Sequence, residues 1–484
     1  MLEKIHTTTA IESRPRRTVR DWLVGTLGLT AFAMLNACVS LAPAPEPVAS
    51  PIAGDWPTPS VASGGVLATG LPWREYFTDP ALQTLIETAL ANNRDLRVAA
   101  LRAEEARAAF RIQRAQQAPM VGVSVQRIRA GLPDSLQPLA GSSVVEANVA
   151  SVGISNWELD LWGRVRSMKT AALEQWLATE QGHRAVEIAL ISQVADAYLG
   201  LRELDERIAL ATRTVENQQA LARIFEKRYE LGHGSRLELT QVNTLLSQGR
   251  ALQVQLALAR EQQRNALALL LGSEPQLSQS SVAMNDSMVM PELSPGLLSD
   301  LLINRPDILA AEHALQARQA NIGAARAAFF PRIALTGAAG TVSADLNDLF
   351  SSGTGAWLFR PVIELPIFDA GMRRANLDLS VVRRDIAIAE YERAIQVAFR
   401  DVSNALVARQ KLAEQTIVAR QARAEQTERL KLARTLFDAG SAAYLEVLDA
   451  ERDLLAVEQQ LVQLHRAALS SQIGLYAALG GGTN

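Results

Sequence analysis

Residues 91–110 read ANNRDLRVAALRAEEARAAF, and residues 303–322 read INRPDILAAEHALQARQANI, a related stretch that begins 212 residues later. The fifth residue of each stretch is an aspartate. Further along the chain, three pairs of glycines recur at an offset of 208 residues: Gly163 and Gly371, Gly232 and Gly440, Gly272 and Gly480. Such a repeat predicts two copies of one structural unit, and we place them at residues 76–290 and 291–484.

The second copy carries the pattern of a long helix. No proline follows Pro366, and a proline inside a helix would cost about 3 kcal/mol. Nearly all of the residues at alternating spacings of three and four are apolar: Val447, Ala450, Leu454, Val457, Leu461, Leu464, Ala468, Ser471, Leu475 and Ala478. A second apolar line runs beside the first: Leu448, Leu455, Val462, Leu469 and Tyr476. A helix with two contact faces is expected to pack within a ring of helices.

The first copy has a weaker form of this pattern, because three equivalent positions are polar: Gln253, Arg260 and Gln263. Its packing is expected to be looser or wetter. Each long helical stretch contains a glycine turn, LGHGS at 231–235 and DAGSA at 438–442, where glycine permits positive φ. Each copy is therefore expected to form a helical hairpin. Its first arm, over residues 166–231 in the first copy, would be about 100 Å long at 1.5 Å per residue.

Four stretches between the helices have strand patterns: residues 120–129, 144–159, 331–340 and 356–365. In the first, the apolar residues Val121, Val123 and Val125 alternate with small or polar residues, as in a barrel strand with lipid on one side and water on the other. Aromatic residues lie near the strand ends, as in an interfacial girdle: Trp157, Trp162, Trp357, Phe359 and Phe368. The alternative is half of a soluble β-sandwich.

Four strands are too few to close a barrel in a membrane. An open strand edge cannot face lipid, and the smallest known barrels have about eight strands. Two, three or four copies of the chain would supply enough strands, and the residues alone do not choose among them. The predicted fold class is therefore mainly α, with long helical hairpins and a β-barrel segment shared between copies.

The N-terminus has the pattern of a secretory signal. Its apolar run, residues 23–35, is shorter than the about 20 residues that a membrane-spanning helix needs. Leu35-Asn36-Ala37-Cys38 resembles the bacterial lipobox, which implies removal of residues 1–37 and acylation of Cys38. The alternative is an ordinary signal peptide with an incidental cysteine. Residues 38–75 are rich in Pro, Ala and Ser, which predicts an extended, lipidated tether.

Composition excludes several classes of function. Lys and Arg number 48 and Asp and Glu 51, a net charge of −3, so no overall field favours nucleic acid. Cys38 is the only cysteine, which excludes a disulfide framework within one chain. Met284, Met288 and Met290 suit a polar connector better than a soft-metal contact. We find no catalytic, cofactor or metal-binding signature and predict no enzyme activity.

Several segments resemble the TolC-type outer-membrane factors, in particular the lipoprotein channels of tripartite efflux systems. They are NRPDI (304–308), FFPRIALTG (329–337), ELPIFDAG (364–371) and AGSAAYLEVLDAERDLL (439–455). The resemblance covers nearly the whole mature chain. It implies a homotrimer with a 12-stranded barrel in the outer membrane of a Gram-negative cell and a helical periplasmic tunnel. It also implies a periplasmic adaptor and an inner-membrane pump of RND type as partners, and no catalysis.

By this resemblance, the hairpin turns form the periplasmic gate and the adaptor-docking tips. The implied gate residues are Glu446, Asp449, Glu238 and Phe437. The implied docking residues are Gly232, His233, Gly234, Ser235, Gly440, Ser441 and Ala442. A ring of carboxylates in a narrow pore attracts cations. Two alternatives are local: Ser235 and Glu238 also fit a capping box, and Glu446 also fits the positive end of a helix dipole.

The favoured function is a passive exit duct for drugs or other toxic small molecules. Within the same class, the alternatives are an exit channel for protein secretion of type I or for metal cations. The alternatives of other classes are a coiled-coil scaffold or adhesin that does not conduct, and an envelope hydrolase. The denser acidic tip and cleaner heptads of the second copy indicate that gating depends more on residues 438–449 than on residues 231–238.

Overall fold

A computed structural model describes most of the chain. The described residues are 41–44, 66–67, 71–131, 133, 135, 143–276, 284, 288–289, 293–294 and 303–481. The predicted signal peptide, Cys38 and most of the predicted tether lie outside them. The chain divides into two compact units: residues 1–45, 111–171 and 318–382 form the first, and residues 46–110, 172–317 and 383–484 the second. Each unit therefore combines segments from both halves of the chain.

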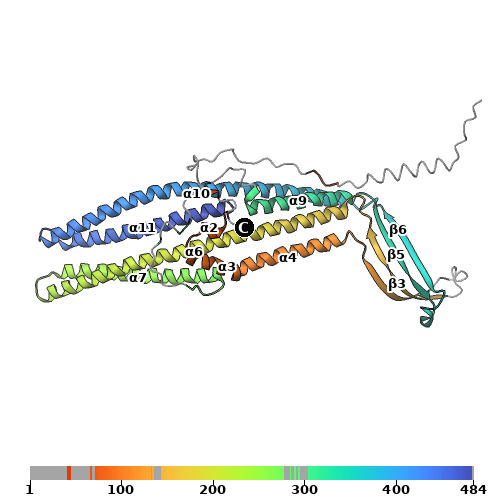
Figure 1. The fold of residues 1–484 in the computed structure, drawn as a ribbon, viewed down its shortest axis with the longest axis horizontal. Helices are drawn as coiled ribbons and strands as arrows, with labels where there is room; N and C mark the ends of the chain where they lie inside the picture. The colour runs from red at the N-terminus through yellow and green to blue at the C-terminus, as the bar shows by residue number, and fades with distance from the viewer. Residues whose placement is uncertain are drawn as a thin grey trace, which may run out of the picture. The chain divides into compact units, whose positions relative to one another are not determined.

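The first unit contains a four-stranded antiparallel sheet (Figure 1). Its strands, in spatial order, are β2 (Val121–Gly131), β3 (Val144–Glu158), β5 (Arg332–Ser343) and β6 (Gly355–Glu364). All four predicted strands are confirmed, and the two predicted pairs are joined through β3 and β5. Among the described strands, β2 and β6 each have one neighbour in this sheet, so both of its edges are open there.

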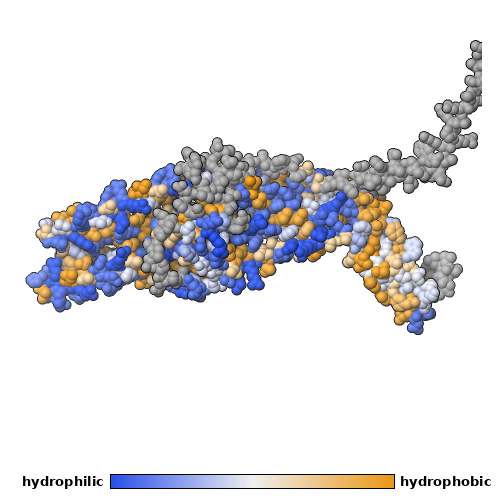
Figure 2. Space-filling view, viewed as in Figure 1, coloured by the Kyte–Doolittle hydropathy of each residue, from blue (hydrophilic) through white to orange (hydrophobic). Residues whose placement is uncertain are grey.

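The two faces of this sheet differ in chemistry. The strand register places seven apolar residues on one face: Val121, Val123, Val125, Val152, Ile154, Trp357 and Phe359. Val123 and Trp357 are each 80% exposed. On the opposite face, Gly122, Ser124 and Gln126 alternate with these valines, and the Oγ of Ser124 lies 3.0 Å from that of Ser151. The predicted alternation is confirmed, and hydrophobic residues are prominent over the strands in Figure 2.

Long helices follow the predicted duplication. The described residues form two helical hairpins: α6 (Arg164–Glu230) with α7 (Arg236–Leu271), and α10 (Met372–Asp438) with α11 (Tyr444–Ala478). Helices α6 and α10 have 67 residues each, and corresponding hairpin helices start 208 residues apart. The shorter helices α4 (Arg94–Ala115) and α9 (Pro306–Ala327) have 22 residues each and start 212 residues apart. Both repeat offsets found in the sequence are thus confirmed.

Shorter elements complete the described chain. They are α2 (Trp73–Tyr76), α3 (Pro80–Asn92), the 3-10 helix η2 (Leu346–Asp348), and the parallel pair β1 (Val66–Leu67) and β4 (Leu293–Ser294). The sequence did not predict the β1–β4 pair, since two-residue strands carry no periodic pattern. Among the described helices, none is both long enough and apolar enough to span a membrane.

The two copies use the same contact where the returning helix ends. In the first copy, Asn93 Nδ2 donates to the carbonyl oxygen of Leu270 at 2.9 Å. In the second copy the equivalent residue is Arg305, which is buried and donates to the carbonyl oxygen of Ala478 at 2.6 Å. Asp307 also binds the Arg305 guanidinium, at 2.6 and 3.0 Å. The NRPD segment therefore fixes the end of α11, because its side chains satisfy carbonyls that a helix end leaves free.

Two apolar clusters form the core of the second unit. The larger contains an aromatic stack, with the rings of Tyr76 and Tyr476 4.2 Å apart, and the Tyr476 hydroxyl donates to the carbonyl oxygen of Leu71. Met284 and Met288 are buried in this cluster. The interpretation of these two methionines as part of a polar connector is therefore wrong, while Met290 lies outside the described residues.

Candidate functional site

The tip of the first hairpin is a capped helix start. Ser235 Oγ accepts from the Glu238 backbone N–H at 3.1 Å, and Glu238 Oε2 accepts from the Ser235 N–H at 2.9 Å. This is a complete capping box, so the local role considered for Glu238 is present. Gly232 has φ of 76°, a conformation that favours glycine. Leu231 and Leu237 flank the turn and are 66% and 67% exposed.

Replacing Glu238 separates its two proposed roles. Glu238→Ala is expected to destabilise the start of α7 by about 1 kcal/mol, because the capping box is lost. Amide hydrogen exchange at residues 235–240 should accelerate accordingly. Glu238→Gln keeps an acceptor but removes the charge, so it should leave exchange close to wild type. Reduced cation preference in Glu238→Gln channels with unchanged exchange would give the charge of Glu238 a role at the pore in addition to its capping role.

The tip of the second hairpin has a different start. Ala443 at the N-cap of α11 makes no side-chain cap, and Gly440 has φ of 69°. Glu446 lies in the first turn of α11 and is exposed, a position favoured by the helix dipole. Asp449 Oδ1 pairs with Arg452 at 3.2 Å, and its side chain is 40% exposed. The structure thus leaves the two predicted gate carboxylates of this tip open to solvent.

An aromatic cluster joins the two hairpins behind their tips. The Tyr444 ring lies 4.5 Å from the Phe225 ring and 4.8 Å from the Phe437 ring. Tyr444 and Phe225 are buried, and burial raises the pKa of the Tyr444 hydroxyl. The cluster brings the predicted gate residue Phe437 together with two aromatic residues that sequence reasoning missed. Tyr444 could have been noticed as an aromatic residue beside the turn, whereas nothing local marks Phe225.

Three ion pairs connect α10 to α11 above this cluster, and we call them the ladder: Arg423–Glu458 at 3.6 Å, Arg429–Asp453 at 2.7 Å and Arg434–Glu451 at 2.7 Å. The hydrogen bond from Arg429 holds the pKa of the Asp453 carboxyl below its usual range, and Arg452 contributes. The Glu451 side chain is only 9% exposed. The ladder therefore cross-links α10 to α11 in the second hairpin, and no local sequence pattern predicted it.

The first hairpin is cross-linked by neutral groups as well as charge. Gln253 donates to Thr212 Oγ1 at 2.9 Å, and Gln263 donates to the Ala197 carbonyl oxygen at 3.0 Å. Arg260 pairs with Asp205 at 2.7 Å. The three polar positions that predicted looser or wetter packing are therefore bonded to α6. Polar residues in a helix seam fix register in this way.

A charged contact also joins the two hairpins. Asp196 on α6 accepts from Arg466 at 2.7 Å and from Ser470 at 2.5 Å, both on α11. Arg207 and Gln459 add a second contact between the same helices, at 2.6 Å. The hairpins of one chain are therefore held together along α6 and α11. Among the described residues, no group of three or more His, Cys, Asp or Glu side chains is placed to hold a metal ion.

The chain matches the family described as outer membrane efflux protein over residues 85–273 and 297–481. It belongs to the outer membrane efflux protein family. The matched ranges fall one in each predicted copy, although the copy boundaries themselves stay a prediction.

Two curated relatives of this efflux protein and one solved structure are informative. The chain is 42% identical to the solvent efflux pump outer membrane protein SrpC of Pseudomonas putida over 465 residues, 94% of this chain and 98% of that protein. It is 40% identical to the antibiotic efflux pump outer membrane protein ArpC of the same species, over 94% and 95%. The open-state structure of the MtrE outer membrane channel of Neisseria gonorrhoeae has 36% identity and a TM-score of 0.84, over 92% and 98%.

Family membership confirms the resemblance found in the sequence, the fold class and an outer-membrane location for this efflux protein. The gate, docking and lipidation residues remain predictions. For Glu238 the structure shows a local contact, and for Asp449 an ion pair within α11. The predicted adaptor-docking positions of the second tip, Gly440, Ser441 and Ala442, lie in the turn between α10 and α11.

Proposed function

We propose that three copies of this chain form the outer-membrane exit duct of a tripartite efflux pump. The observation that carries the proposal is the open-edged sheet with one exposed apolar face. Its free edges need partners, because unpaired backbone groups cannot face lipid. Three copies would supply 12 strands, within the range of known barrels. The helical hairpins would then form the periplasmic tunnel.

The proposed cargo is small organic molecules. Relatives at 40–42% identity are named for solvent and antibiotic efflux, which supports this class over metal cations or secreted proteins. In a deletion strain, the chain should restore resistance to solvents and several antibiotics. Restored resistance to copper or silver salts alone would favour metal efflux. Restored export of a protein substrate alone would favour secretion. A non-conducting scaffold would restore none of these, and we propose no catalytic activity.

The proposed partners are a periplasmic adaptor and an inner-membrane pump of RND type. The proposed adaptor-docking surface consists of the two turns: Gly232, His233, Gly234 and Ser235 in the first, and Gly440, Ser441 and Ala442 in the second. Exposed Leu231 and Leu237 beside the first turn support this role, because apolar residues at a surface suit a protein partner. Cross-linking from cysteines placed at Gly234 and Ser441 would identify the partner.

The gate proposal assigns cation preference to Glu446 and Asp449. In the trimer, three copies of each carboxylate would ring the pore entrance and attract cations. The double variant Glu446→Ala, Asp449→Ala is therefore expected to lose most cation preference and most block by trivalent cations in single-channel recordings. Glu414→Ala, an exposed carboxylate on α10 paired with Lys411, serves as the control and should change neither property. Unchanged selectivity in the double variant would remove the gate assignment.

A further inference from the structure

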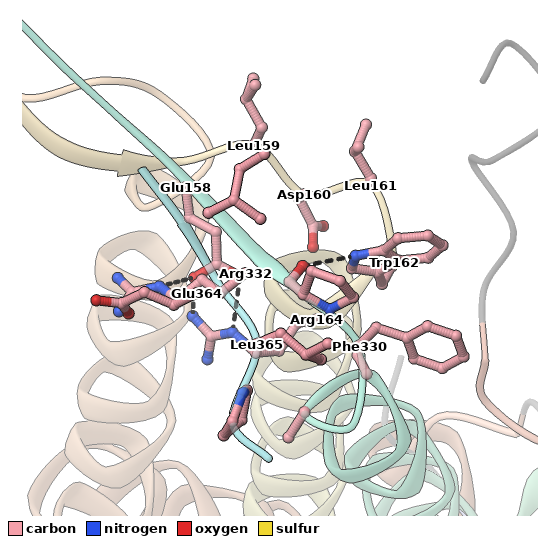
Figure 3. A pocket seen from close by; sticks show the side chains of 15 residues that line it. Glu158, Leu159, Asp160, Leu161, Trp162, Arg164, Phe330, Arg332, Glu364 and Leu365 are labelled. Atoms are coloured by element: carbon pink, nitrogen blue, oxygen red, sulfur yellow. Dashed lines mark hydrogen bonds and ion pairs between the residues drawn. The ribbon is translucent and has the colours of Figure 1, made fainter. Parts of the chain in front are cut away.

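A cavity of about 610 Å³ lies in the first unit, where the sheet meets the helix ends (Figure 3). Much of its lining is apolar and includes Leu159, Leu161, Trp162, Phe330 and Leu365. The Trp162 and Phe330 rings stack with their centroids 4.8 Å apart, and Trp162 Nε1 donates to the Pro331 carbonyl oxygen. The volume of the cavity falls in the range of about 300–1,000 Å³ that is usual for largely apolar small-molecule pockets.

The two arginines that line this cavity, Arg164 and Arg332, are paired within it, and the lining carboxylate Glu364 adds a negative charge. Glu158 accepts from Arg164 at 2.9 and 2.8 Å and from Arg332 at 3.0 Å. Asp160 accepts from the backbone N–H groups of Val165 and Arg166 at the start of α6. Each lining arginine is thus paired with a carboxylate of the same site. A ligand with a phosphate would find its cations already engaged, so the cavity favours an uncharged apolar group.

Within the described segment 41–44, Leu41 and Ala42 contact α9 near this cavity. Ala42 lies against Gly323 of α9, where an added Cβ would come within 2.9 Å of the Ala42 Cβ. One residue earlier, the Leu41 carbonyl oxygen accepts from Arg326 at 3.1 Å. From Ala42 to Leu41 the chain therefore follows α9 toward its C-terminal end. The residues beyond Arg326 are Ala327 and Ala328, which line the cavity.

Cys38 lies outside the described residues, but its separation from Leu41 along the chain is known. It precedes Leu41 by three residues, and an extended chain covers about 3.5 Å per residue, or about 10 Å in all. Along α9 the distance from Gly323 to Ala327 is about 6 Å at 1.5 Å per residue. A span of three residues is therefore long enough for an acyl chain on Cys38 to reach the cavity rim.

We propose that the cavity holds an acyl chain carried by Cys38 of the same polypeptide. This inference rests on the acylation of Cys38 that the lipobox resemblance predicts. A diacylglycerol joined to the cysteine sulfur is uncharged, which matches a cavity whose arginines are already paired. A free phospholipid would bring a phosphate and has no tether to this position. The bound chain would tie the sheet unit directly to the lipid anchor.

The test uses a palmitate analogue that carries a diazirine and an alkyne. Cells that make the full chain are fed the analogue and irradiated. The protein is then purified, and peptide mass spectrometry locates the label and its cross-links. The proposal predicts label on Cys38 and cross-links from that label to residues 159–162 or 327–331. If Cys38 is labelled but the cross-links fall only on residues outside the cavity, the placement of the acyl chain in the cavity is overturned and the lipidation of Cys38 stands. Absence of label on Cys38 would overturn both.

Two variants exclude other occupants. Cys38→Ser should abolish the cross-links to the cavity residues. If the cavity residues still cross-link to free phospholipid at wild-type yield, the occupant is bulk lipid and the proposal is overturned. Ala328→Trp should fill the cavity and remove most cross-links without changing the label on Cys38. Ala115→Trp, at the exposed end of α4, is the matched control and should leave them unchanged. Equal yields from both tryptophan variants would also overturn the proposal.

Discussion

Val125→Lys is expected to prevent stable assembly of the chain in the outer membrane. Val125 is 71% exposed on the apolar face of β2, near the middle of an 11-residue strand. A lysine on the lipid face near the bilayer midplane costs about 2–4 kcal/mol, and a trimer carries that cost three times. Heat-stable oligomers should therefore be lost on semi-native gels, together with efflux-dependent resistance.

The neighbouring position supplies the control. Gln126 lies on the opposite face of the same strand and is exposed. Gln126→Lys adds the same charge at nearly the same depth, but into the proposed aqueous lumen, where it should leave assembly intact. If both variants assemble, or if Gln126→Lys is the one that fails, the assignment of faces is wrong.

Arg434→Ala is expected to loosen the tip of the second hairpin. Its partner Glu451 is 9% exposed, so removal of the guanidinium leaves a nearly buried carboxylate. Breaking a buried pair in this way costs about 3–5 kcal/mol. Because Arg434 itself is 54% exposed, solvent screening reduces the expected loss to about 1–3 kcal/mol. Hydrogen exchange in residues 444–455 should accelerate about 5- to 150-fold.

Another rung of the ladder gives the comparison. Arg423 pairs with Glu458 at 3.6 Å, and the Glu458 side chain is 27% exposed, so Arg423→Ala should cost less than about 1 kcal/mol. The double variant Arg434→Ala, Glu451→Gln should recover much of the loss, since no charge is left buried. Equal exchange in the Arg434 and Arg423 single variants would show that the buried carboxylate does not stabilise the tip.

Much of the fold was predictable because local periodic patterns in the sequence indicate its helices, strands and turns. Glycines at a constant offset marked the hairpin turns, and the alternation of Val121, Val123 and Val125 marked a strand with two different faces. The junction between the two middle strands was not predictable, because pairing of β3 with β5 joins residues that are far apart in the chain. No local pattern specifies such a partner.

The candidate site was predicted less completely for the same reason. The sequence identified carboxylates near the turns, including Glu446 and Asp449, but not their surroundings. Phe225 and Tyr444 meet only through tertiary packing. Gln253 was interpreted as a sign of loose packing, yet its amide bonds Thr212 across the seam. A residue type can be read from the sequence, whereas the partner that satisfies it depends on which helices lie side by side.

The central claim is that copies of this chain enclose a water-filled duct across the outer membrane. Single-channel recording of the purified, folded oligomer in planar lipid bilayers tests it most directly. The structure predicts discrete conductance steps of uniform size with a preference for cations, and their absence in the Val125→Lys variant. A folded oligomer that inserts into the bilayer and conducts no ions would contradict the claim.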